Sequence, residues 1–327
     1  CDNCCTYCAI PSIRGKFRSR NMDDVLYEAR MLADSGVKEL IVVAQDTSRY
    51  GTDLPGNKRL LPELLEKLCE IDGFEWIRIH YVYPDEIDDE LIDVIATEPK
   101  IVKYLDLPIQ HCNDHVLKLM NRRHDAATAR KAYAILEQAG VGNISVDLIF
   151  GLPQLSDDQW NQTLDQALSI SSQGLKPCHI SSYQLSVEPG SALARLVERG
   201  KWEEATEEAC ARQYDILCSR LKEAGYHHYE ISNFALPGYE ARHNSAYWAH
   251  VPYVGLGPGA HSFITAAQPK GENEYIRRWN RSDLDAYIAD SLSVSEHEVL
   301  DDEQIIMEEV MLALRTSAGV SEAFIRE

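Results

Sequence analysis

Apolar residues in the first 190 positions occur at two spacings that alternate along the chain. Short apolar runs such as 39–44 predict buried strands, and apolar residues at helical spacing, as in 23–34, predict helices. The expected strands are 39–44, 76–80, 102–107, 144–150 and 179–185. The expected helices are 23–34, 61–71, 88–96 and 157–171, and helical segments are expected within 116–140. Strands that alternate with helices favour parallel pairing through right-handed crossovers, which gives a barrel or a doubly wound sheet.

The pattern changes after about Pro189. A long charged stretch with helical spacing (192–225) is followed by a region rich in glycine and aromatic residues (226–263), and helical, acidic sequence then resumes. We therefore expect two domains, 1–190 and 191–327, of which the second is a mainly helical, truncated extension.

Charge and cysteine content narrow the possible functions. The 327 residues carry a formal net charge of −20, and a surface this acidic repels phosphate backbones, so nucleic-acid binding is not expected. The basic segment 14–20 is a local exception, and its simplest interpretation is a solvated loop. Four of the nine cysteines fall within the first eight residues, which fits one metal cluster in a reducing cytoplasm better than a disulfide framework. No apolar run of about 18 residues predicts a membrane span.

The first eight residues contain a C-x3-C-x2-C pattern formed by Cys1, Cys5 and Cys8. Three thiolates on one tight loop can hold three irons of a 4Fe–4S cluster and leave the fourth iron open. A zinc knuckle is the alternative, because Cys4 supplies a fourth thiol, but four ligands within eight residues are cramped for a tetrahedral site. We expect Cys4 to be a bystander.

This cysteine pattern resembles that of the radical SAM (S-adenosylmethionine) superfamily, and residues 1 to about 122 are similar to the radical SAM domain of the methylthiotransferases that modify a ribosomal protein. The matching motifs are Cys1–Pro11, Arg14-Gly15, Ser19-Arg20, Ala44–Gly51 and Tyr104–His111. This resemblance implies an α/β fold, namely a partial (β/α)6 radical SAM barrel. Its first strand is expected to be missing, because none is predicted before Cys1.

From about His124 to residue 327 the sequence is instead similar to the HemW-type haem chaperones, which are relatives of the oxygen-independent coproporphyrinogen oxidases. The matching motifs are Ser145–Pro153, Ser182–Gly190, Tyr229–Asn233, His243–Trp248 and Gly255–Ser262. The segment 110–124 suits either family. We therefore hypothesise a chimera, natural or assembled, with its seam near 122–124.

The resemblance implies a set of SAM-binding residues. These are Tyr7, Ile149 and Gly151 for adenine, Gln45 and Asp46 for the methionine amino group, Gln110 and Arg122 for the methionine part, and Asp147 for the ribose. A guanidinium suits the SAM carboxylate because its fork pairs both oxygens. Ile149 has an equally simple interpretation as strand core. The haem-chaperone pattern is broken at 44–48 and at Tyr81, so the SAM pocket is expected to be a hybrid.

The second set of candidate residues is His243, Asn244, Tyr247 and Trp248. Histidine can ligate haem iron and aromatic rings can cover a porphyrin face, and the resemblance associates this motif with haem-handling proteins. The alternative is a structural aromatic loop in which His243 bonds to the backbone.

The first functional hypothesis is a HemW-like haem chaperone, or a coproporphyrinogen oxidase-like enzyme of porphyrin metabolism, with a 4Fe–4S cluster, SAM and haem as cofactors. A chaperone role would not need enzymatic turnover. Its expected partners are haem or porphyrin, a haem-acceptor protein, and an electron donor such as flavodoxin or ferredoxin. The alternative is a methylthiotransferase that inserts sulfur into a C–H bond of a ribosomal protein or tRNA. That family also uses a second cluster in a preceding domain, which is lacking in this chain. A fusion without function is a further alternative.

Overall fold

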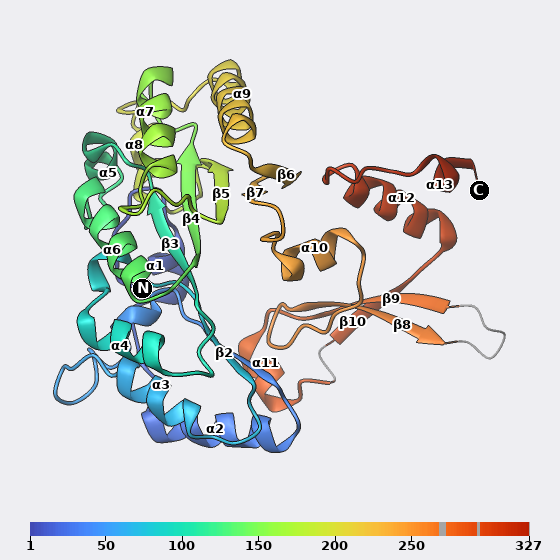
Figure 1. The fold of residues 1–327 in the computed structure, drawn as a ribbon. Helices are drawn as coiled ribbons and strands as arrows, with labels where there is room; N and C mark the ends of the chain where they lie inside the picture. The colour runs from blue at the N-terminus through green and yellow to red at the C-terminus, as the bar shows by residue number, and fades with distance from the viewer. Residues whose placement is uncertain (268–272, 293–294, 327) are drawn as a thin grey trace. The chain divides into compact units, whose positions relative to one another are not determined.

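The computed structural model describes residues 1–267, 273–292 and 295–326, which form two compact units (Figure 1). The first unit comprises Cys1–His227 and Ser232–Tyr239, and the second comprises His228–Ile231 and Glu240–Glu327. The division falls later than the boundary expected near 190, because the helix that follows that position packs within the first unit.

The first unit confirms the alternation of strands and helices read from the hydrophobic pattern. Its elements in chain order are α1 (Ile10–Arg14), α2 (Met22–Asp34), β1 (Glu39–Val42), α3 (Leu61–Cys69), β2 (Trp76–Ile79), α4 (Asp89–Thr97), β3 (Tyr104–Gln110), α5 (Asp114–Leu119), α6 (Ala126–Gln138), β4 (Asn143–Phe150), α7 (Asp157–Leu168), β5 (His179–Gln184), α8 (Ala192–Glu198), α9 (Glu207–Glu223) and β7 (Asn233–Ala235). The helical segments expected within 116–140 are parts of two helices, α5 and α6, because Asn113 and Asp125 each cap a separate start.

Two sheets form the framework of the first unit. β1 pairs with β2 in parallel, and β3, β4 and β5 form a second parallel run that β7 extends in the antiparallel direction. An isolated parallel bridge between Ile77 and Ile101 connects the β2 side to the segment before β3. The sheets do not close into a full barrel, so the expected partial barrel is confirmed.

The two faces of the second sheet differ in polarity. Successive side chains of a strand point to opposite faces, so each strand divides its residues between them. One face belongs to the main hydrophobic core and contains Leu105, Leu107, Ile109, Ile144, Val146, Leu148, Ile180 and Phe234. Burial of each such side chain contributes roughly 1.5–3 kcal/mol to folding. The opposite face carries Asp106, Ser145, Asp147, Ser181 and Asn233, which places polar chemistry on the inner side of the partial barrel.

The second unit is built on a small antiparallel sheet. Its elements are β6 (His227–Glu230), which begins at the boundary, and then α10 (Arg242–Trp248), β8 (His261–Ala267), β9 (Asn273–Asn280), α11 (Leu284–Ala289), β10 (Ser295–Leu300), α12 (Asp302–Ala313) and α13 (Glu322–Arg326). The sheet order is β10-β9-β8, around a small core of Phe263, Leu300 and Ile305.

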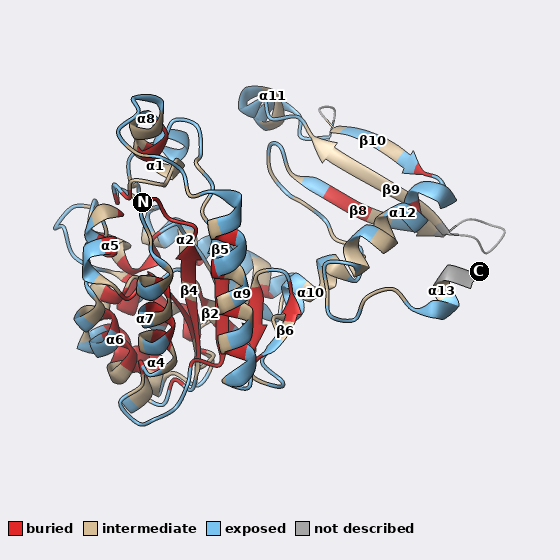
Figure 2. Cartoon of the chain, turned by 90° about the horizontal axis from the view of Figure 1, so that it is seen from above, coloured by how far each residue is buried: buried red, intermediate tan, exposed pale blue. Residues whose placement is uncertain are grey.

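The sequence analysis did not predict this sheet. The described residues of β9 are all half-buried, and the strand carries the charged pair Arg277 and Arg278, so it lacks the apolar run that marks the strands of the first unit. Figure 2 shows the buried residues concentrated in the first unit. Within the described ranges, none of the helices has the length and apolar character that a bilayer crossing requires.

Candidate functional site

The cysteine loop, residues 1–8, lies on the turn that follows α5. The amide of Thr6 donates to the carbonyl of Met120 at 3.0 Å, and its hydroxyl donates to the carbonyl of Leu119 at 3.2 Å. The Asn121 side chain donates to the carbonyl of Cys4 at 2.7 Å. These bonds fix the backbone of the loop against a segment more than a hundred residues away in sequence.

Arg122 links this turn to the cysteines. Its Nη1 lies 3.4 Å from the Sγ of Cys5, its Nη2 donates to the Pro108 carbonyl at 2.6 Å, and its guanidinium lies 4.9 Å from the centroid of the Tyr83 ring. Its Nε is buried and has no hydrogen-bond partner. A buried cation with an unused donor is suited to an anionic ligand.

The acid–base properties of the loop follow from burial and from Arg122. Burial alone would lower the pKa of Arg122, but Tyr7, Cys5 and Tyr83 outweigh it and raise that pKa. Burial raises the pKa of Tyr7, against the opposing effect of Arg122. Burial also raises the pKa of the Cys8 thiol, so a metal that binds this sulfur has to displace a proton.

The three cysteines of the motif share these surroundings. Cys1 Sγ lies 3.8 Å from the hydroxyl of Tyr83, the same residue that stacks on Arg122. Cys4 is exposed, and its Sγ faces the carbonyl of Asp2. Three thiols beside a buried guanidinium fit a sulfur-ligated cluster by their chemistry. Over the described ranges, however, no three His, Cys, Asp or Glu side chains are arranged as a metal site, so the ligand set remains a prediction.

Asp147 lies on the inner face of β4, in register with Ser181 of β5. Burial and the neighbouring Asp106 raise its pKa to about 7, while a hydrogen bond from Ser181 and the charge of Arg122 oppose the shift. The side chain keeps some solvent exposure although it lies deep in the protein. This combination fits a carboxyl that an entering ligand can reach.

Tyr7 and Ile149 meet in a small apolar cluster. Ile149 is buried with Val116, Met120 and Leu152, and Tyr7 packs against the same cluster. The cysteine loop and β4 therefore come together where the sequence predicted the adenine site. Ile149 is also strand core, so both interpretations of this residue fit its position.

Gly151 directly follows β4 and cannot be replaced without strain. Its φ is +71°, and a Cβ there would lie 3.0 Å from Cys210 Sγ and 3.3 Å from Gln184 Cγ. Its amide donates to the side chain of Gln213 on α9 at 2.8 Å. The loop after β4 is thus held in one conformation.

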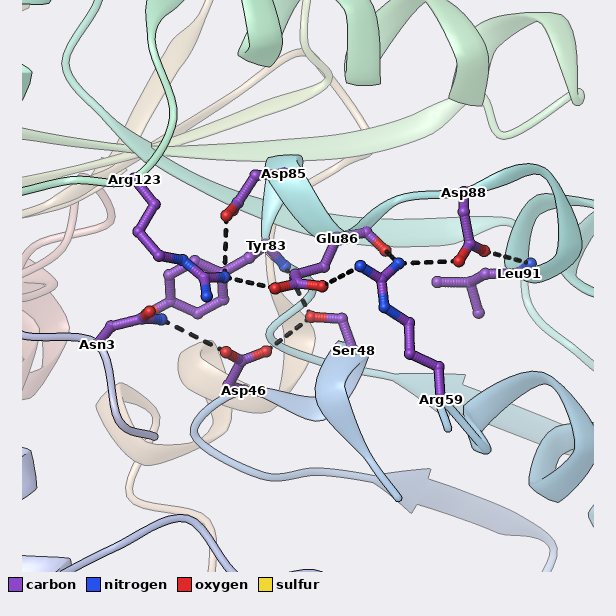
Figure 3. Close-up of polar contacts among 10 residues, drawn as sticks. All are labelled: Asn3, Asp46, Ser48, Arg59, Tyr83, Asp85, Glu86, Asp88, Leu91 and Arg123. Carbon is purple, nitrogen blue, oxygen red and sulfur yellow. Dashed lines mark hydrogen bonds and ion pairs between the residues drawn. The ribbon is translucent and has the colours of Figure 1, made fainter. Parts of the chain in front are cut away.

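The residues predicted to hold the methionine part of SAM are in different environments. Gln45 is exposed after β1, whereas Asp46 is fully buried. Asp46 accepts hydrogen bonds from Ser48 at 2.7 Å and from Asn3 at 3.4 Å (Figure 3). Gln110 is the last residue of β3, and its φ is +64°. The register of the β3–β4 pair shifts between Leu107 and Gln110, and such a local distortion changes the direction in which a side chain points.

Sequence reasoning did not single out a histidine–carboxylate pair beside Asp147. Asp106 accepts from His80 Nδ1 and from the Tyr81 amide, each at 2.8 Å. Asp106 gave the same signal as Asp147, a carboxylate within an apolar strand, and could have been found in that way. Tyr83, Asn3 and Ser48 gave no comparable signal, because their roles depend on contacts between distant segments.

The predicted haem residues lie on α10 in the second unit. His243, Asn244 and Tyr247 are exposed and Trp248 is half-buried. The Tyr247 hydroxyl lies 3.3 Å from His243 Nε2, the rings of Tyr247 and Tyr253 are 5.0 Å apart, and Arg315 lies over Trp248 at 5.7 Å. Of the four residues, His243 and Tyr247 contact each other one turn apart on this short helix.

A comparison with protein families gives the class of this chain. The model of the radical SAM superfamily matches residues 1–167, which is half of the chain. The chain therefore belongs to the radical SAM superfamily, whose members use a 4Fe–4S cluster and SAM.

Among curated proteins, the chain is 42% identical over 224 residues to the ribosomal protein uS12 methylthiotransferase RimO of Clostridium tetani, which covers 67% of this chain and 49% of the relative. It is 61% identical over 123 residues to RimO of Lachnoclostridium phytofermentans, which covers 38% of this chain and 28% of the relative. The chain thus spans less than half the length of either relative.

Among solved structures, coproporphyrinogen III oxidase (HemN) from Escherichia coli, described as a radical SAM enzyme, matches with a TM-score of 0.61 at 19% identity. The match covers 97% of this chain and 73% of that chain, and it supports the fold. The curated relatives favour the methylthiotransferase alternative over the first-ranked HemW-like hypothesis.

Proposed function

We propose that the first unit is a radical SAM enzyme with a 4Fe–4S cluster on Cys1, Cys5 and Cys8 and with SAM bound between the cysteine loop and β4. The observation that supports this most is the half-buried Arg122, which contacts Cys5 and whose buried Nε has no hydrogen-bond partner. When bound, the cluster and SAM would supply a 5′-deoxyadenosyl radical by reductive cleavage of the sulfonium bond, with the electron from a donor such as flavodoxin or ferredoxin.

The side chains of this chain would orient SAM. Arg122 would pair its guanidinium with the carboxylate of SAM, and Gln110 would contact the same end of the ligand. Asp147 would accept hydrogen bonds from the ribose hydroxyls, and Tyr7, Ile149 and Gly151 would enclose the adenine. Gln45 would be the exposed contact to the methionine amino group.

We propose further that the substrate is a ribosomal protein such as uS12, on the support of the RimO relatives. The radical would remove a hydrogen atom from an unactivated C–H bond, the first step towards sulfur insertion. Cys69, Cys112, Cys178 and Cys210 are buried, so they do not form a second exposed three-cysteine loop. Complete sulfur transfer would therefore need sulfur from outside the described residues.

The test is anaerobic reconstitution with iron and sulfide, followed by reduction in the presence of SAM. The proposal expects a broad absorption shoulder near roughly 400 nm and release of 5′-deoxyadenosine, both lost in Cys5→Ala. Deuterated uS12 would then transfer deuterium into 5′-deoxyadenosine. Zinc in place of iron, with no 5′-deoxyadenosine, would sink the proposal. Release of 5′-deoxyadenosine without deuterium transfer would reject uS12 as the substrate and leave the radical SAM proposal standing.

A second candidate function is haem binding on α10, favoured by an exposed His243 whose ring is held by Tyr247. It would give the chain the haem-delivery role of a HemW-like chaperone, with haem or porphyrin and a haem-acceptor protein as partners. Titration with haem would give a Soret band that His243→Ala removes. No band in the wild-type chain would reject this function.

The organisation of the chain is a proposal as well. We infer a family seam near 122–124, with a radical SAM part up to residue 190 and a HemW-like part beyond it, in a cytoplasmic protein. One RimO relative matches over 123 residues at 61% identity and another over 224 residues at 42%, so the identity to this family falls as the match lengthens. Long-read sequencing of the source DNA tests whether the two parts are joined in nature, because an assembled chimera would give no continuous read across residues 122–124.

A further inference from the structure

We infer that Asp46 is a positioning residue that holds the cysteine loop through Asn3, and that its carboxylate does not bind SAM directly. This departs from the role expected of Asp46 from sequence. It rests on the proposed function only in that the loop is taken to carry the cluster.

The first observation is that both oxygens of the Asp46 carboxylate are occupied. Oδ1 accepts from the Ser48 hydroxyl at 2.7 Å, and Oδ2 accepts from the Asn3 amide at 3.4 Å. The side chain is completely buried. Because none of the side chain is exposed, a methionine amino group could reach the carboxylate only if the groups that cover it moved aside.

The second observation is the position of Asn3 within the loop. Asn3 lies between Cys1 and Cys5, and it is itself buried. A buried amide that donates to a buried carboxylate fixes the part of the loop that carries it, because leaving either group unpaired costs about 1–3 kcal/mol. Asp46 therefore restrains the spacing between the first two cysteines of the motif.

The third observation is that the same hydrogen-bond chain reaches the cysteines from the other side. The Ser48 hydroxyl also accepts from the Tyr83 amide at 3.4 Å. The Tyr83 ring stacks on Arg122, which contacts Cys5, and the Tyr83 hydroxyl lies near Cys1. Figure 3 shows Asn3, Asp46, Ser48 and Tyr83 as one connected group. Residues that follow β1 and β2 thus contact the loop at two points, Asn3 and Cys1, and Tyr83 also stacks on the Arg122 that contacts Cys5.

The neighbouring ion pairs supply a matched control. Glu86 is buried between two arginines, with Oε1 2.6 Å from Arg123 and Oε2 2.5 Å from Arg59. Arg59 also pairs with Asp88, the N-cap of α4, at 2.8 Å. Arg59 belongs to the network in Figure 3, and the hydrogen bonds and ion pairs of its side chain are to Glu86 and Asp88 rather than to the cysteine loop. Loss of Arg59 tests network stability without altering the loop.

The experiment compares the full-length chain with Asp46→Asn, Ser48→Ala, Asn3→Ala and Arg59→Met. In the metal-free protein, the rate of maleimide labelling of Cys5 is measured by peptide mass spectrometry. After reconstitution, iron per chain, the midpoint potential of the cluster and the Kd for SAM are measured. Thermal unfolding of each variant shows which ones fold.

The inference expects Asp46→Asn, Ser48→Ala and Asn3→Ala each to raise Cys5 labelling at least fivefold, to lower bound iron, and to shift the midpoint potential of the remaining cluster. The Kd for SAM, corrected for cluster content, stays within threefold of wild type. Arg59→Met lowers the melting temperature and leaves Cys5 labelling unchanged. If Asp46→Asn does not fold, Ser48→Ala and Asn3→Ala carry the test.

A direct role for Asp46 predicts the opposite pattern. In that case Asp46→Asn weakens SAM binding tenfold or more, while Cys5 labelling is unchanged and Ser48→Ala and Asn3→Ala have no effect. That result overturns the inference. A wild-type chain that takes up no iron would reject the cluster, yet the labelling rates would still decide whether Asp46 holds the loop.

Discussion

The cysteine loop of the first unit and the α10 surface of the second unit are two candidate sites with different construction. The cysteine loop is contacted by residues from several distant segments, among them Arg122, Tyr83 and Asp46, of which Asp46 is buried and the other two are half-buried. On α10, the hydrogen bond of His243 is to Tyr247 one turn along the same helix, and both residues are exposed.

This difference has a physical consequence. A buried network leaves unpaired polar groups when one member is removed, so its members are strongly coupled. An exposed pair on one helix turn contributes only a few tenths of a kcal/mol and can be replaced by water. We therefore expect substitutions around the cysteine loop to have large effects and substitutions on α10 to have small ones.

The largest effect is expected from Cys5→Ala. Cys5 is the buried member of the motif and contacts Arg122, so its loss should remove the cluster and leave a buried cation without its sulfur partner. Iron content after reconstitution should fall from about four per chain to near zero. The control is Cys4→Ala, which changes an exposed thiol and should keep full iron content. Equal losses in the two variants would contradict the predicted ligand set.

The next largest effect is expected from Arg122→Ala. A hydrogen bond to a charged group is worth about 1.5–3 kcal/mol, so loss of the guanidinium should weaken SAM binding roughly 10- to 100-fold. Arg122→Lys keeps the positive charge but loses the two parallel donors of the guanidinium, so its affinity for SAM should lie between those of the wild type and Arg122→Ala. The control is the adjacent Arg123→Ala, since Arg123 pairs with Asp85 and Glu86. Isothermal titration of the reconstituted protein measures the three affinities, and an equal loss in Arg123→Ala would refute the assignment.

A moderate effect is expected from Asp147→Asn, and it depends on pH. Burial and the neighbouring Asp106 raise the pKa of Asp147 in the folded protein to about 7, well above the ordinary value of an aspartate, so the native state binds the proton more tightly than the unfolded state. The free energy of unfolding should therefore fall by on the order of 2–4 kcal/mol as the pH rises from about 4 to 7, and it should stay level above pH 7.

Asp147→Asn should remove this fall and make the protein more stable at pH 8. Urea denaturation of the unligated chain at pH 5 and pH 8 measures the difference. Asp158→Asn, which changes an exposed carboxyl, is the matched control. A wild-type chain that is more stable at pH 8 than at pH 5, with the difference unchanged in Asp147→Asn, would disprove the raised pKa.

The same contrast explains what could be predicted from sequence. The elements of the first unit were read correctly because apolar spacing is a local signal, set by which face of each strand or helix is buried. Asp147 was assigned from the family resemblance, and its place as a carboxylate within an apolar strand favoured the assignment. The strands β8, β9 and β10 were missed because most of their described residues are half-buried or exposed, which leaves no apolar run in the sequence.

The contacts of the site could not be predicted. The hydrogen bond between Asn3 and Asp46 joins positions 43 residues apart, and the contact of Arg122 with Cys5 spans 117. Nothing in the local pattern at Asn3 or Tyr83 marks them, because their roles arise only when β1, β2 and the turn after α5 come together. The resemblance gave Asp46 as a ligand, but it could not show that the carboxylate was already bonded.

The smallest effect is expected on α10, and it tests the weaker of the two sites. If haem binds there, His243→Ala should remove the axial ligand and abolish the Soret shift, whereas Tyr247→Phe removes only the hydroxyl that bonds to His243 Nε2. The phenylalanine variant keeps the ring that contacts Tyr253, so its haem affinity should change by less than about fivefold, the scale of one exposed hydrogen bond. Because both side chains are exposed, neither substitution should alter the melting temperature or the iron content. A loss of iron in His243→Ala would mean that the two sites are coupled and would end the contrast drawn between them.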